Sequence, residues 1–280
     1  MSEPFDPHSV PVKAAATVML VRDAAEDQGA PKGIEVFMLR RTLQAVFAGG
    51  MYVFPGGRLD DVDGGPAMEA MCDGLSDARA SELLQIPLGG LAYWVAAIRE
   101  CFEEAGVLLA RSADSGHEVR FDEAERAQRF TAARHQVHDG ALDLIDLCQA
   151  EGLRLMTDSI SYTAHWVTPI GEPRRFDTRF FLARAPHAQE PLHDDSETIA
   201  SLWVRPADAL ARERAGELVM LPPTISCLRF LEPHTSADEA LAAAASIGVP
   251  PRILPKVKWG EPGTRLEVVL PGEPGYDDMP

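Results

Sequence analysis

Cysteine is scarce in this 280-residue chain, and its four copies are far apart. They are Cys72, Cys101, Cys148 and Cys227, and none belongs to a CxxC pair or to the Cys/His spacing of a zinc site. This pattern argues against a disulfide framework and against a structural zinc module. We interpret the cysteines as reduced, mostly buried thiols and expect a cytoplasmic protein.

Positive charge is also in short supply. The chain has 26 Lys and Arg against 43 Asp and Glu, a formal net charge of −17 and a pI near 4.8. Non-specific nucleic-acid binding needs a basic surface, so we expect no nucleic-acid partner. An anionic small molecule is still compatible with this composition, because a metal ion and a few arginines can reverse the sign of the charge inside a cleft.

Long apolar runs are absent, since no stretch approaches the length that spans a bilayer. The N-terminal residues 1–22 have no basic region followed by a long apolar core, so we expect no signal peptide. The sequence also lacks a P-loop, a GxSxG nucleophile elbow and an HExxH zinc motif. A membrane protein and these three enzyme classes are therefore not indicated.

What the chain does contain is an acidic cluster in residues 97–109, AIRECFEEAGVLL, where Arg99 and three glutamates precede Gly106. On a helix of about 3.6 residues per turn, Glu103, Glu100 and Glu104 lie roughly 40°, 100° and 140° from Arg99 and share one side. Carboxylates this close raise each other's pKa, and a hard divalent cation such as Mg²⁺ removes that cost. The alternative is a solvated helix face with ion pairs four residues apart.

This segment resembles the second half of the Nudix box, G-x5-E-x7-R-E-U-x-E-E-x-G-U, where U is aliphatic. Residues 54–58, FPGGR, are similar to the strand and loop that lead into the box. Gly57 and Arg99 are 42 positions apart, so about 28 residues separate the two halves. A box split in this way, and the stretch 166–183, resemble the branch of Nudix hydrolases that includes the peroxisomal acyl-CoA diphosphatase.

The resemblance implies a set of catalytic residues. Glu100, Glu103 and Glu104 would be ligands of Mg²⁺ or Mn²⁺, and Arg99 would orient a neighbouring glutamate. The loop residues Gly56 and Gly57 would supply backbone torsions and a backbone carbonyl. A further acidic residue often comes from a facing loop, for which Glu197 is the first candidate and Asp195 the second.

Arginines suit the phosphates of a nucleotide because the guanidinium forms bidentate contacts. The predicted substrate-binding residues are Arg40, Arg58, Arg174 and Arg175. His135 and His138 have helical spacing but no partner pattern around them, so we predict that they lie on the surface. The first glutamate of the box has no clear counterpart, because counting back from Arg99 reaches Leu91, whereas counting forward from Gly57 reaches Asp63.

The resemblance predicts a Nudix-type α/β/α sandwich around a mixed sheet, with helical insertions and extra C-terminal helices. A single domain is expected at 12–260, with insertions at about 60–88 and 112–155 and terminal extensions at 1–11 and 261–280. The expected strands are 12–22, 34–40, 51–54, 107–110, 160–169, 175–184, 198–204 and 265–270. The expected helices are 76–84, 91–104, helical segments within 122–152, and 206–215, 224–231 and 237–247.

The leading functional hypothesis is divalent-metal-dependent hydrolysis of a diphosphate bond in a nucleoside diphosphate linked to another moiety. By resemblance, the substrate is coenzyme A or acyl-CoA, giving 3′,5′-ADP and (acyl)phosphopantetheine. An ADP-ribose or ADP-sugar diphosphatase is the enzymatic alternative. A non-catalytic Nudix-fold nucleotide-binding module is a third hypothesis, against which the three retained glutamates argue. A homodimer through the second insertion or the C-terminal helices is a further hypothesis.

Overall fold

The computed structural model describes residues 6–25, 32–45, 48–194, 197–260 and 265–279. The α-helices are α1 (Pro66–Glu69), α2 (Asp77–Leu84), α3 (Leu91–Ala105), α4 (Ala124–His138), α5 (Leu144–Glu151), α6 (Pro206–Arg214), α7 (Pro222–Leu231) and α8 (Ala237–Ser246). The strands are β1 (Val12–Asp23), β2 (Ile34–Arg41), β3 (Tyr52–Val53), β4 (Gly56–Arg58), β5 (Ala110–Ser112), β6 (Leu153–Leu155), β7 (Ser161–Val167), β8 (Arg175–Arg184), β9 (Thr198–Val204), β10 (Arg252–Ile253), β11 (Lys256–Trp259) and β12 (Arg265–Val269). Two short 3-10 helices are η1 (Asp61–Asp63) and η2 (Thr157–Ser159).

The central sheet is mixed and forks beside β1. One edge of β1 pairs in parallel with β8 along ten residues. The other edge pairs antiparallel with β4 at Ala15–Thr17 and then with β2 at Val21–Asp23. Since β2 and β4 share one edge of β1 and are not paired with each other, the sheet divides between them. This fork frees backbone groups of the Gly-rich loop to bind side chains.

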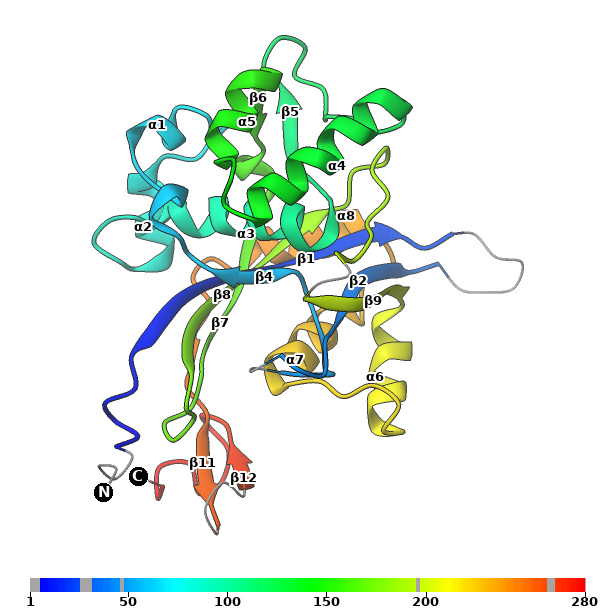
Figure 1. Ribbon diagram of the computed structural model, residues 1–280. Coiled ribbons are helices and arrows are strands. Elements are labelled where there is room, and N and C mark those ends of the chain that lie inside the picture. Colours follow the sequence, from blue (N-terminus) through cyan, green and yellow to red (C-terminus); the bar gives the residue numbers. More distant parts are fainter. Residues whose placement is uncertain (1–5, 26–31, 46–47, 195–196, 261–264, 280) are drawn as a thin grey trace.

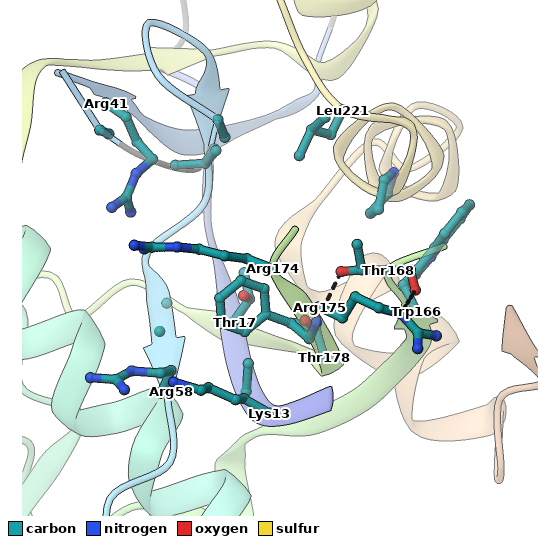
Figure 2. Close-up of a pocket in the computed structure, with 18 of the residues that line it drawn as sticks. Lys13, Thr17, Arg41, Arg58, Trp166, Thr168, Arg174, Arg175, Thr178 and Leu221 are labelled. Carbon is teal, nitrogen blue, oxygen red and sulfur yellow. Dashed lines mark hydrogen bonds between the residues drawn. The ribbon is translucent and has the colours of Figure 1, made fainter. Parts of the chain in front are cut away.

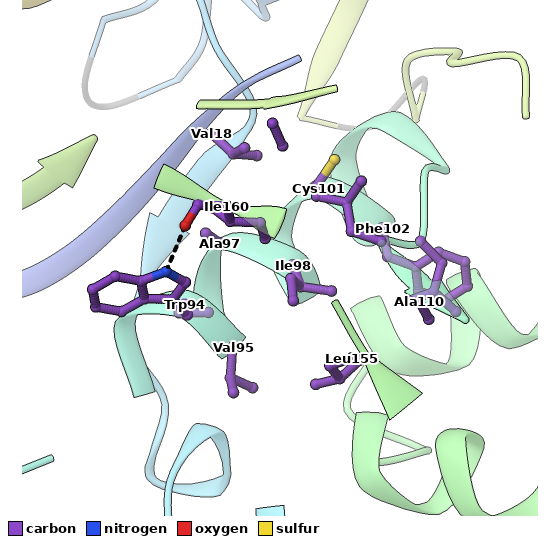
Figure 3. Packing of buried hydrophobic residues seen from close by; sticks show 14 of the residues in the cluster. Val18, Trp94, Val95, Ala97, Ile98, Cys101, Phe102, Ala110, Leu155 and Ile160 are labelled. Carbon is purple, nitrogen blue, oxygen red and sulfur yellow. Dashed lines mark hydrogen bonds between the residues drawn. The ribbon is translucent and has the colours of Figure 1, made fainter. Parts of the chain in front are cut away.

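Helices cover both faces of the sheet (Figure 1), and alternation along β1 divides the core between them. Val18 and Leu20 pack with α3, whereas Met19 and Val21 pack with α7 and α8. On the α3 side, the Trp94 indole donates its Nε1–H to Ile160 O at 3.0 Å, so its polar group is satisfied inside the apolar cluster (Figure 3). The expected α/β/α sandwich is confirmed.

The first insertion anchors the beginning of α3. The Asp77 carboxylate accepts hydrogen bonds from Gly89 N and Leu91 N, both at 3.0 Å, and the Ser81 hydroxyl accepts one from Gly90 N at 2.9 Å. Helix α2 therefore caps the N-terminal turn of α3, a role that a residue directly before a helix usually fills. Gly90 makes this contact possible, because a Cβ there would lie 2.2 Å from Ser81 N.

The second insertion anchors the end of the same helix. Arg134 of α4 is buried, donates Nε–H to Glu103 O at 2.8 Å and donates Nη2–H to Leu192 O at 3.1 Å. A guanidinium at this position satisfies a terminal carbonyl and complements the negative end of the helix dipole. Both insertions thus hold α3 in place.

The C-terminal residues add an antiparallel ribbon, β11–β12, which projects below the main body (Figure 1). Strand β12 confirms the expected strand at 265–270, but β10 and β11 were not predicted. Among the helices that the structure describes, none has the length and apolar character needed to cross a bilayer.

Two local predictions are corrected. The expected strand at 107–110 begins only at Ala110, because the Gln189 side chain occupies the backbone of Leu108. Leu108 N donates to Gln189 Oε1 at 2.9 Å, and Gln189 Nε2 donates to Leu108 O at 3.0 Å. Residues 56–58, expected as a loop, form β4. The remaining expected helices and strands are present, with the strands at 175–184 and 198–204 at their expected bounds and the others shifted by one or two residues.

Gly90→Ala should lower the free energy of unfolding by about 3 kcal/mol, because the added methyl group meets backbone of α2 that cannot move aside. Urea denaturation followed by circular dichroism measures this loss. Gly89→Ala is the matched control, since its Cβ meets nothing within 4 Å and only its φ of +79° opposes the change. The control should lose about 1–2 kcal/mol. Equal losses would contradict the proposed clash.

Candidate active site at the fork of the sheet

A cavity of about 1080 Å³ opens at the fork (Figure 2). Its lining residues include Lys13, Thr17, Arg41, Gly56, Gly57, Arg58, Arg99, Glu100, Glu103, Glu104, His138, Trp166, Arg174, Arg175, Phe176, Glu197, Leu221 and Pro222. The acidic cluster of α3 and the Gly-rich loop therefore face the same space. Among the site residues expected from the sequence that the structure describes, all line this cavity except Arg40.

Arg99 is the most highly connected side chain of the site. Its Nε and Nη2 donate to the two carboxylate oxygens of Asp63 at 2.8 and 2.9 Å, and Nη2 also donates to Arg58 O at 2.8 Å. Asp63 is 1% exposed and Arg99 is 5% exposed, so this bidentate pair is buried. Asp63 thus takes the position of the first glutamate of the box, for which the sequence offered no clear counterpart. Its pair with Arg99 joins η1 to α3.

The third guanidinium nitrogen of Arg99 orients two glutamates of α3. Arg99 Nη1 donates to Glu100 Oε1 at 2.9 Å and to Glu103 Oε1 at 3.0 Å. The Glu100 carboxylate lies against the loop, since a Cβ at Gly57 would be 2.5 Å from its oxygens. Gly57 is required here by the close approach of the carboxylate to the loop backbone.

Glu104 faces the loop and a second cation. Its Oε2 accepts a hydrogen bond from Gly56 N at 2.9 Å, and its Oε1 lies 3.4 Å from Arg41 Nη1. Arg41 Nη2 also lies 3.2 Å from Glu197 Oε2. Arg41 therefore bridges the box helix and the loop that carries Glu197. Glu197 faces the box helix across the cavity. Asp195 lies outside the described residues.

Burial sets the electrostatics of these glutamates. Burial raises the pKa of Glu100 to about 7, although the Arg99 charge opposes the shift. Burial, followed by repulsion from Glu100, raises the pKa of Glu104 well above its usual value. Burial also raises the pKa of Glu103. The ionised site is therefore unfavourable by itself, a state that a cation would relieve.

The donor set suits a hard divalent cation, because it consists of carboxylate oxygens facing a cavity beside a backbone loop. In the parts of the chain described, no three His, Cys, Asp or Glu side chains already surround a common metal position. Arg99 Nη1 holds one oxygen of each of two glutamates, and Arg41 contacts the third. Holding a metal would thus require glutamate oxygens to turn away from these guanidinium groups.

His138 was predicted to lie on the surface, and this prediction is corrected. It lines the cavity, and its Nδ1 lies 3.9 Å from Glu103 Oε2. His135 is exposed, as predicted. The sequence held no signal for the difference, because only the packing of α4 against α3 turns one of the two histidines toward the site.

Arg40 is the second correction. Its Nε lies 3.4 Å from Gly50 O and its guanidinium stands 5.9 Å from the Tyr52 ring centroid, outside the cavity lining. Neighbouring residues of a strand point to opposite faces, so Arg41 faces the cavity instead. Lys13, which was not among the predicted substrate-binding residues, also lines the cavity. The alternation of β1 could have indicated it, because Lys13 lies on the same face as Thr17.

Asp63→Asn should lower the free energy of unfolding by about 3–5 kcal/mol, because it removes one partner of a buried bidentate ion pair. Glu197→Gln is the control, since that carboxylate is 49% exposed and its loss should cost less than about 1 kcal/mol. Urea denaturation of both variants tests the difference. Similar losses would show that the Asp63 pair does not hold the site together.

Comparisons with known proteins identify the family. A family model described as the NUDT19 Nudix domain matches residues 66–231. Acyl-coenzyme A diphosphatase NUDT19 of Gallus gallus is 27% identical over 250 residues, covering 75% of this chain and 65% of that protein. The protein of the same name from Xenopus laevis is 25% identical over 281 residues, covering 88% of this chain and 72% of its own. The chain thus spans about two thirds of the length of these relatives.

A solved structure shares both fold and sequence. The crystal structure of a NUDIX hydrolase from Alicyclobacillus acidocaldarius superimposes with a TM-score of 0.67 at 30% identity, covering 84% of this chain and 97% of that one. The family match spans more than half of the chain. It begins after Asp63, so it includes neither the Gly-rich loop nor the Asp63 side of the buried ion pair. The chain belongs to the Nudix hydrolase family, with a Nudix domain of the NUDT19 type.

Proposed function

We propose that the chain hydrolyses the diphosphate bond of coenzyme A or an acyl-CoA in a divalent-metal-dependent reaction. The products would be 3′,5′-ADP and phosphopantetheine or its acylated form. The observation that carries the proposal is the convergence of three glutamates of α3, two of them buried and one half-buried, with Arg41 and the Gly56 N–H at one cavity. The relatives named acyl-coenzyme A diphosphatase support the choice of substrate.

Glu100, Glu103 and Glu104 would hold Mg²⁺ or Mn²⁺, which polarises phosphoryl oxygens and lowers the pKa of a bound water. The chain's own groups do the remaining work. Arg99 fixes the orientation of Glu100 and Glu103 through its pairing with Asp63. Arg41, placed between Glu104 and Glu197, supplies positive charge that a diphosphate oxygen can share.

The cavity also has an apolar wall suited to the pantetheine end of the substrate. This wall consists of residues from β7, from β8 and from the start of α7, including its N-cap: Trp166, Phe176, Phe180, Leu221 and Pro222. Figure 2 shows Trp166 and Leu221 on the side of the cavity away from the charged ends of Arg41, Arg58 and Lys13. A cavity that is charged at one end and apolar at the other fits a nucleotide joined to a long, weakly polar arm.

Purified protein should hydrolyse CoA and acetyl-CoA in the presence of Mg²⁺ or Mn²⁺ and should lose this activity in EDTA. Mass spectrometry should detect 3′,5′-ADP together with phosphopantetheine. ADP-ribose, which lacks the pantetheine arm, is the comparison substrate and should be hydrolysed more slowly. Hydrolysis of ADP-ribose with intact CoA would refute the substrate assignment, and turnover of neither compound would refute the proposed reaction.

Glu104→Gln should reduce metal-dependent hydrolysis by more than about 100-fold, because it removes a carboxylate from the centre of the site. The same change should raise the free energy of unfolding of metal-free protein at pH 8. A carboxyl group whose pKa is raised by folding costs stability that grows as pH rises from its unfolded-state pKa toward its raised folded-state pKa, and a neutral amide removes the cost.

The control for this prediction is Glu82→Gln, which changes a glutamate with a 70% exposed side chain on α2. It should leave both the hydrolysis rate and the unfolding free energy unchanged. Initial rates with CoA and urea denaturation in EDTA measure the two effects. A Glu104→Gln protein that is less stable than the unmodified protein at pH 8 would contradict the electrostatic argument.

A further inference from the structure

Three cations of the cavity have no counter-ion among the residues that the structure describes. Lys13, Arg58 and Arg174 all line the cavity, yet within the described ranges none of them forms an ion pair. By contrast, Arg41 and Arg99 each pair with two or more carboxylates. The chain carries 43 acidic residues against 26 basic ones, so acidic partners are plentiful overall. Three unpaired cations at one cavity therefore indicate that their negative charge comes from a ligand.

The strand register separates these cations from the glutamates of α3. A Cβ at Gly57 would point into the Glu100 carboxylate, so this position of β4 faces α3. The next residue, Arg58, faces the opposite side of the sheet. Its register partner on β1 is Ala15, which faces the same side as Arg58. Lys13 lies two residues before Ala15 and shares its face. Arg58 and Lys13 thus lie on the far side of β4 from the metal-binding glutamates.

Arg174 approaches the same region from the turn between β7 and β8. Figure 2 shows the side chains of Lys13, Arg58 and Arg174 extending toward the same side of the cavity, with the charged end of Arg174 between those of Arg41 and Lys13. Arg175, its neighbour in sequence, points elsewhere and donates Nε–H to Thr168 O at 3.1 Å. The three cations therefore come from β1, β4 and the β7–β8 turn, three separate segments that line one cavity.

One phosphate group cannot satisfy both sides of β4. The scissile diphosphate in the proposed function belongs beside Glu100, Glu104 and Arg41. We propose that Lys13, Arg58 and Arg174 form a second anion subsite, which binds a phosphate monoester carried by the substrate apart from the diphosphate. The identity of this group rests on the proposed function, in which it is the 3′-phosphate on the ribose of CoA. The subsite would distinguish CoA from nucleotides that lack this phosphate.

The test compares two ligands that differ only in this phosphate. Isothermal titration calorimetry in EDTA measures binding of 3′,5′-ADP and of 5′-AMP to the full chain. The unmodified protein should bind 3′,5′-ADP at least about tenfold more tightly. In the double variant Lys13→Gln/Arg58→Gln, and separately in Arg174→Gln, this ratio should fall toward one. Arg79→Gln, which changes an exposed arginine of α2 outside the cavity, should retain the ratio.

Equal affinities for the two ligands in the unmodified protein would overturn the proposal. A ratio that survives in both variants would do so as well. A ratio of affinities is insensitive to a modest loss of folded protein, and circular dichroism checks that each variant is folded. Because neither ligand contains a diphosphate bond, the result does not depend on turnover. Protein that shows the ratio but leaves CoA intact would refute the proposed reaction and keep the subsite. Protein that hydrolyses CoA but binds both ligands alike would refute the subsite alone.

Discussion

The buried ion pair between Asp63 and Arg99 is the interaction on which the site depends. It joins η1, directly after the Gly-rich loop, to the middle of α3, across an inserted segment that separates them in the sequence. The same guanidinium holds Glu100 and Glu103. A pair this deeply buried is strongly unfavourable to break, because Nε of the Arg99 guanidinium would lose its carboxylate partner at a site closed to water. The positions of loop, helix and carboxylates are therefore set together.

The placement of the three glutamates of α3 lowers the stability of the folded protein when they are ionised. They are close together and lie mostly out of contact with water, Glu103 and Glu104 buried and Glu100 half-buried, and their pKa values are raised as a result. The rest of the domain compensates by anchoring α3 at both ends, through Asp77 of the first insertion and Arg134 of the second. The insertions thus act as supports for the box helix. The second one also contributes His138 to the cavity.

Charge is distributed unevenly over the molecule. The chain as a whole is strongly acidic, yet Lys13, Arg41, Arg58, Arg174 and Arg175 all line one cavity. The same lining carries six acidic side chains, as many as its basic ones, so the cavity lacks the acidic excess of the chain. An anionic nucleotide can therefore bind there despite a net charge of −17, with a metal ion adding positive charge. An acidic exterior also disfavours polyanions such as nucleic acids, which would contact far more of the surface than a nucleotide that enters the cavity.

The sequence by itself determined the family, the box helix and the charged residues at the centre of the cavity, because the cluster at 99–104 obeys a helical period and the neighbouring segments resemble a known motif. Only the tertiary structure decided which of two adjacent or nearby candidates faces the site. Arg41 lines the cavity whereas Arg40 does not, and His138 lines it whereas His135 is exposed. Of the two positions reached by counting, neither of which matched the box cleanly, Asp63 is the one that pairs with Arg99. Each of these outcomes depends on strand register or on the packing of an insertion, which brings together residues far apart in the chain, and such long-range contacts leave no periodic signal in the sequence.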